Sequence, residues 1–71
     1  MIAKTFAYHK PSRDGFVSIT RLRAAYTALQ EEIERECPVS RERAVALTEL
    51  ETSAMWAVKA VVHNDPNSEA E

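Results

Sequence analysis

The sequence predicts an all-α fold: an antiparallel two-helix hairpin, preceded by a short N-terminal arm and assembled as a homo-oligomer. Two stretches with apolar residues at helical spacing flank one short proline-containing segment, CPVS, and this arrangement predicts the hairpin. The short length of the chain predicts that it assembles with copies of itself. A chain of 71 residues seldom gains more than about 3–5 kcal/mol from its own core, so self-association is expected.

The arm is predicted over residues 1–11, and the first helix follows it. Ser12 comes directly after a proline and is a suitable N-cap, with Asp14 in the first turn beside the positive end of the helix dipole. The helix is therefore predicted to begin near residue 12 or 13. The alternative is a loop through RDG with Ser18 as the cap, and the sequence leaves this choice open.

Apolar residues at steps of three and four predict that the first helix is amphipathic with a narrow packing seam. These residues are Ile19, Leu22, Tyr26, Leu29 and Ile33. Pro38 disfavours helical geometry at the residue before it, so the helix is predicted to end ahead of CPVS. Ser40 is then the expected cap of a second helix.

The second helix carries a broader apolar surface than the first. One stripe is widened by residues on a neighbouring face, and together they are Leu47, Leu50, Ala54, Met55, Ala57, Val58, Val61 and Val62. An arc wider than one partner helix can cover implies a second partner, which in a two-helix chain is another copy. Trp56 is assigned to this contact between copies. The hairpin is predicted over residues 12–63, and the polar stretch 64–71 as a frayed, flexible tail.

Charge is distributed unevenly along the chain. The net charge is −2, which argues against a protein that coats long DNA or RNA. Residues 1–25 carry five basic residues and one acidic residue, whereas residues 26–71 carry four basic and ten acidic residues. A basic end on an acidic body suits a small anion better than a polymer.

The setting predicted from the sequence is a reducing, intracellular one. Cys37 is the one cysteine, so the chain has no internal disulfide. The stretch MIAKTFAYHK lacks the apolar run of a signal peptide or membrane span. His9 and His63 show no spacing typical of metal ligands, and the thiol has no neighbouring base, so an enzyme is not expected.

The candidate binding residues lie in the arm, within FAYHKPSRDG. Tyr8 is followed by His9, Lys10 and Pro11, which places a stacking face next to positive charge. A structural role for the tyrosine, covering the helix ends, is an equal alternative. Arg23 on the first helix is a further candidate cation, although surface arginines commonly have no such role.

YHKPS, LRAA and CPVSRERAVALTELETSAMWAVKAVV resemble the phage anti-CBASS proteins that sequester cyclic oligonucleotide signals. Their helical hairpin is shared with an anti-Thoeris sponge. The resemblance spans roughly residues 6–63, and its most specific part is SRERAVALTELETSAMWA. It implies a homohexameric sponge without a cofactor, which binds cyclic dinucleotides such as cyclic GMP-AMP in the cytoplasm of an infected bacterium and blocks CBASS immunity.

The resemblance also carries site residues. A binding tyrosine ahead of the first helix matches Tyr8, and a basic residue fifteen positions later matches Arg23. Some members have lysine there, and Ala24 and Ala25 replace polar residues of some relatives. A cyclic dinucleotide presents phosphates and bases, so its site needs both cations and flat surfaces. Arg23 supplies a cation and Tyr8 a flat surface.

Several alternatives stay open at this stage. They are a separate cyclic trinucleotide site, a sponge for cyclic ADP-ribose signals, a hairpin that docks on an acidic surface of a partner protein, and a hydrolase of the same signals. Binding of intact ligand distinguishes the sponge from the last two.

Overall fold

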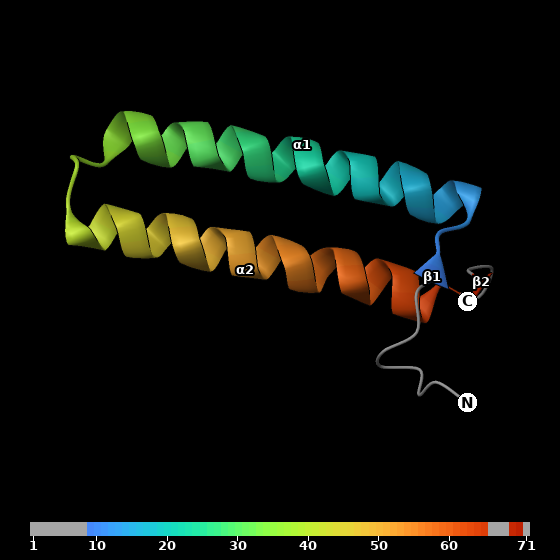
Figure 1. Ribbon diagram of the computed structural model, residues 1–71. Coiled ribbons are helices and arrows are strands. Elements are labelled where there is room, and N and C mark those ends of the chain that lie inside the picture. Colours follow the sequence, from blue (N-terminus) through green and yellow to red (C-terminus); the bar gives the residue numbers. More distant parts are fainter. Residues whose placement is uncertain (1–8, 66–68, 71) are drawn as a thin grey trace.

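Two long helices lie side by side in the computed structural model, which describes residues 9–65 and 69–70 (Figure 1). The chain runs through β1 (His9–Lys10), α1 (Arg13–Glu36), α2 (Arg41–Asn64) and β2 (Glu69–Ala70). The predicted helical hairpin is therefore confirmed. A short connection closes one end of the hairpin, and we refer to the opposite end as the open end.

α1 begins where its capping signals predict. Ser12 has extended backbone geometry, and its hydroxyl accepts a hydrogen bond from the Gly15 amide at 3.1 Å. The Phe16 amide donates to the Ser12 carbonyl at 2.8 Å, which starts the helical pattern of bonds. The alternative start with Ser18 as the cap is wrong, because α1 already begins at Arg13, five residues before Ser18.

The connection between the helices is held by local hydrogen bonds. The Cys37 amide donates to the Ile33 carbonyl at 2.9 Å, and the following proline prevents the helix from continuing. Ser40 then caps α2 by accepting from the Arg43 amide at 3.1 Å. The Arg43 guanidinium also donates to the Cys37 carbonyl at 3.5 Å, which ties the start of α2 to the end of α1.

The two helices pack through the predicted seam, with one exception. Ile19 and Val62 are 5% and 9% exposed and form the buried apolar core of the described chain. The seam residues Leu22, Tyr26 and Ile33 are half-buried. Leu29, predicted to lie in the seam, is 48% exposed, because one neighbouring helix covers only part of the stripe.

The open end contains a short antiparallel pair of strands. His9 is paired with Ala70, and Lys10 with Glu69. β1 lies next to the end of α2 (Figure 1). The structure thus differs from the frayed tail predicted from residue 64 onward: α2 continues to Asn64, and two later residues pair with the arm.

The hairpin is a slab one helix thick. The two helices lie in a single layer (Figure 1), and the molecule extends 46 × 25 × 12 Å along its principal axes. Both broad faces are therefore open. Large apolar side chains remain exposed on them and on the edges, including Phe16, Met55 and Trp56 at 59%, 67% and 65%.

Candidate functional site

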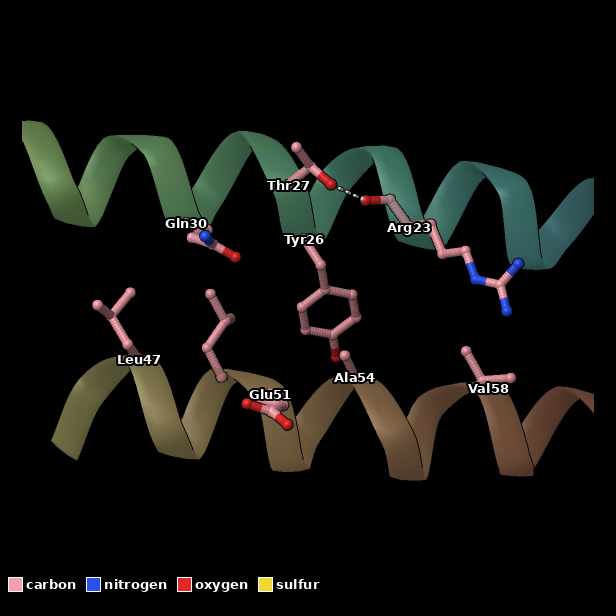
Figure 2. Close-up of a pocket in the computed structure, with 9 residues that line it drawn as sticks. Arg23, Tyr26, Thr27, Gln30, Leu47, Glu51, Ala54 and Val58 are labelled. Atoms are coloured by element: carbon pink, nitrogen blue, oxygen red, sulfur yellow. Dashed lines mark hydrogen bonds between the residues drawn. The ribbon is translucent and has the colours of Figure 1, made fainter. Parts of the chain in front are cut away.

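A groove of about 520 Å³ runs between the helices on one broad face. Both helices contribute to it with residues at successive turns, so the lining follows directly from helical periodicity. The lining residues are Arg23, Tyr26, Thr27, Gln30, Leu47, Leu50, Glu51, Ala54 and Val58 (Figure 2). The groove therefore combines an apolar surface, mostly from α2, with polar groups mostly from α1.

The Tyr26 side chain spans the groove from α1 to α2. Its ring extends from α1 toward α2 in Figure 2, and its hydroxyl shares a hydrogen bond of 2.7 Å with the Ser53 hydroxyl. The hydroxyl is thereby satisfied, while the half-buried ring supplies a flat surface. This bond holds the two helices in register at the middle of the hairpin.

Two opposite charges face the groove, Arg23 from α1 and Glu51 from α2. Arg23 is exposed, and none of the ion pairs within the described part of the chain involves its guanidinium. Thr27 lies one turn further along α1 and donates its hydroxyl to the Arg23 carbonyl at 2.7 Å (Figure 2). The Arg23 side chain is thus available to an external anion, and Glu51 to an N–H donor.

Of the arm residues predicted to bind ligand, the described ones, His9–Pro11, lie at the open end. Lys10 is exposed and Pro11 half-buried, while His9 is described only by its backbone pairing. Tyr8 lies outside the described residues. Among the predicted site residues that the structure describes, Arg23 alone lines the groove.

The structure does not bring Arg23 and the described arm residues together within one chain. α1 is continuous from Arg13, so Arg23 lies ten residues further on, about 15 Å along the helix axis at 1.5 Å per residue. A ligand that contacts both regions therefore needs either a long reach or a second copy.

Sequence reasoning missed most of the groove. The sequence pattern explains Tyr26 as a residue of the packing seam, and Leu47 and Val58 as part of the apolar stripe of the second helix. Glu51 is exposed and also lines the groove. A hydroxyl-bearing aromatic in an otherwise aliphatic seam is the one signal in the sequence that points to this place.

A smaller depression of about 220 Å³ lies on α2, lined by Met55, Trp56 and Lys59. The Lys59 ammonium is 5.3 Å from the centroid of the Trp56 ring, which is within cation–π range. The exposure of this cluster agrees with the predicted role of Trp56 in a contact between copies, and that role stays a prediction.

The described residues contain no cluster of three or more side chains suited to hold a metal ion. Neither helix of this part of the chain combines the length and the apolar character needed to cross a membrane.

A thin helical hairpin with an open groove of mixed polarity belongs to the class of small helical binding modules. The chain is a member of the Acb2/Tad1 hairpin-domain family, whose model matches residues 1–62. This family consists of sponge-type binders rather than enzymes. Searches of curated proteins and of solved structures found no significant match.

Proposed function

We propose that this protein binds cyclic dinucleotide second messengers such as cyclic GMP-AMP, holds them without cleavage, and thereby blocks CBASS immunity. The observation that carries the proposal is the groove, whose lining combines the Arg23 cation, the Tyr26 ring and apolar side chains of α2. Its volume of about 520 Å³ lies within the range of about 300–1,000 Å³ typical of small-molecule sites.

Each part of the ligand has a matching group in the groove. The Arg23 guanidinium offers paired N–H donors to a phosphate. The Tyr26 ring and the aliphatic side chains of Leu47 and Val58 provide surfaces for the faces of the bases. Glu51 and Gln30 are suited to the polar edge of a base, because a carboxylate accepts from base N–H groups and an amide both donates and accepts.

The charge of the groove suggests that each site is shared between copies. Arg23 and Glu51 cancel within one chain, whereas a cyclic dinucleotide carries two negative charges. The arm sequence supplies further cationic and aromatic groups, and its described residues lie at the open end, away from Arg23. A second copy could bring its arm, with Tyr8 and Lys10, to the groove of the first.

The direct test is a calorimetric titration with cyclic GMP-AMP. Arg23→Ala should weaken binding by about 1.5–3 kcal/mol through the loss of charge-assisted hydrogen bonds. Arg21→Ala is the matched control, because it removes the same charge from the same helix outside the groove, and its effect should stay within about 0.5 kcal/mol. Intact ligand should be recovered after the complex is heat-denatured.

Three outcomes would contradict this proposal. Equal losses of affinity in Arg23→Ala and Arg21→Ala would mean that Arg23 acts only through long-range electrostatic attraction. Recovery of linear nucleotide would identify a hydrolase. The absence of binding to any cyclic di- or trinucleotide would favour a protein-docking module, whereas binding of cyclic ADP-ribose isomers alone would identify a different ligand class.

Shared sites are tested by mixing two damaged variants. Tyr8→Ala should weaken binding by about 1–3 kcal/mol through lost stacking, and Arg23→Ala by the amount given above. When the two are refolded together, sharing between copies produces some intact sites, so part of the high-affinity binding should return. If mass spectrometry shows mixed assemblies and no affinity returns, both residues act within one chain.

A further inference from the structure

A carboxylate from the end of α2 reaches the residue that starts α1. One oxygen of Asp65, Oδ2, accepts hydrogen bonds from the Ser12 backbone N–H at 3.3 Å and from the Ser12 hydroxyl at 2.5 Å. The two residues are 53 positions apart in the sequence, and both are half-buried. We refer to this pair of contacts as the Ser12–Asp65 bridge.

The surrounding residues are arranged to admit this bridge. The Ser12 hydroxyl that donates to Asp65 also accepts from the Gly15 amide at 3.1 Å, so one side chain both caps α1 and holds α2. Gly15 is buried, and a Cβ at this position would collide with the Asp65 carboxylate. The one glycine of the chain therefore stands where the carboxylate needs the space.

The bridge fixes the point at which the arm leaves the hairpin. Ser12 is preceded by Pro11, whose ring restricts its backbone, and then by Lys10 in the pairing with β2. Anchoring Ser12 thus fixes the position of the described arm residues His9–Pro11 next to the hairpin. A binding segment that is already positioned loses less conformational freedom when it meets a ligand, and its affinity is correspondingly higher.

We infer that Asp65 is a positioning residue for ligand binding: it holds the arm residues His9–Pro11 through Ser12, and it does so without contacting the ligand. This inference rests on the proposed function, because it assumes that the arm contributes to the site. For the effect of removing Asp65 on ligand affinity, it predicts the opposite of what charge repulsion alone predicts. If Asp65 acted only through its charge, its removal would strengthen the binding of an anion; if it positions the arm, its removal weakens binding.

The experiment measures cyclic GMP-AMP affinity and thermal unfolding for the full chain and three variants. Asp65→Ala removes the acceptor and should weaken binding about tenfold, the order expected when a charge-assisted hydrogen bond that holds a binding group is lost. Asp65→Asn keeps an acceptor oxygen for Ser12 and removes the charge, so affinity should change by no more than about twofold.

Asn64→Ala is the matched control for a purely structural effect. Asn64 caps the same end of α2 by donating to the Ala60 carbonyl at 2.8 Å, and its side chain is exposed. This variant should lower the unfolding temperature while the affinity of the folded protein stays unchanged. The comparison separates a loss of stability at this helix end from a loss of arm position.

The outcomes are distinct. Binding by the wild type with unchanged or tighter binding by Asp65→Ala would overturn the positioning role and leave the proposed function intact. If Asp65→Ala does not fold, Asp65→Asn decides, because tighter binding by that variant would show that charge alone matters. No binding by the wild type would overturn the proposed function and this inference with it.

Discussion

Gly15 occupies the first turn of α1, where helix propensity alone would favour almost any other residue except proline. Glycine in a helix costs about 0.5–1 kcal/mol relative to alanine. Here the missing Cβ leaves room for the Asp65 carboxylate, which takes hydrogen bonds from both the amide and the hydroxyl of Ser12. The carboxylate also lies next to the positive end of the α1 dipole, which stabilises its charge.

The effect of Gly15→Ala on the free energy of unfolding should therefore change sign with the residue at position 65. In the natural background the new methyl group displaces the carboxylate, and the loss of about 1.5–3 kcal/mol from its hydrogen bonds exceeds the propensity gain. The net destabilisation should be about 1 kcal/mol. In the Asp65→Ala background the same substitution should stabilise by about 0.5–1 kcal/mol.

Urea unfolding measures the free energy of unfolding of the natural chain, of Gly15→Ala, of Asp65→Ala and of the double variant. All four are measured at one protomer concentration, because the stability of an assembly depends on concentration. The natural chain and Asp65→Ala provide the two reference stabilities. An equal effect of Gly15→Ala in both backgrounds would show that the close approach of Gly15 to Asp65 has no energetic consequence.

At the scale of the elements, local signals predict most of the helix boundaries. Ser12 and Ser40 were both identified as caps from their positions after a proline segment, and both accept a backbone N–H in the structure. Pro38 likewise predicts the end of α1. These features depend on residues within a few positions of one another, so a single sequence contains the information needed to place them.

Contacts between distant elements could not be predicted in this way. Asp65 was assigned to a tail, because nothing near it in the sequence indicates an N–H donor 53 positions away. The pairing of β1 with β2 involves two residues on each side, too few for an alternating pattern.

The groove also could not be predicted from local sequence patterns. Arg23 was identified through the family resemblance, but Tyr26 and Leu47 had each been explained as packing residues. A groove exists only where the surfaces of two helices meet, and which residues flank the contact depends on how the helices are rotated. Helical periodicity gives the apolar face and leaves this rotation undetermined.

At the scale of the whole molecule, the slab leaves the chain with a small core. Ile19 and Val62 are the large apolar side chains that are buried among the described residues, while Met55 and Trp56 remain about two-thirds exposed. Apolar surface of this extent is typical of a contact with another molecule. The prediction that the chain assembles with copies of itself therefore gains a physical basis, and it stays a prediction.

Sedimentation should show an oligomer at micromolar concentration. Trp56→Ala should weaken assembly by about 2–4 kcal/mol, the range of an aromatic residue at the centre of an interface. Val39→Ala is the control, because Val39 lies in the connection between the helices and is 89% exposed. A folded monomer of the natural chain at this concentration would refute the prediction.

The two ends of the hairpin differ in the length of chain that their contacts close, and this difference sets an order of folding. The Arg43 contact with Cys37 spans six residues, whereas the Ser12–Asp65 bridge spans 53. Closing a longer loop costs more chain entropy, and contacts distant in sequence form more slowly. We expect the hairpin to close from its connection outward, so that the arm takes its place only after both helices have formed and aligned.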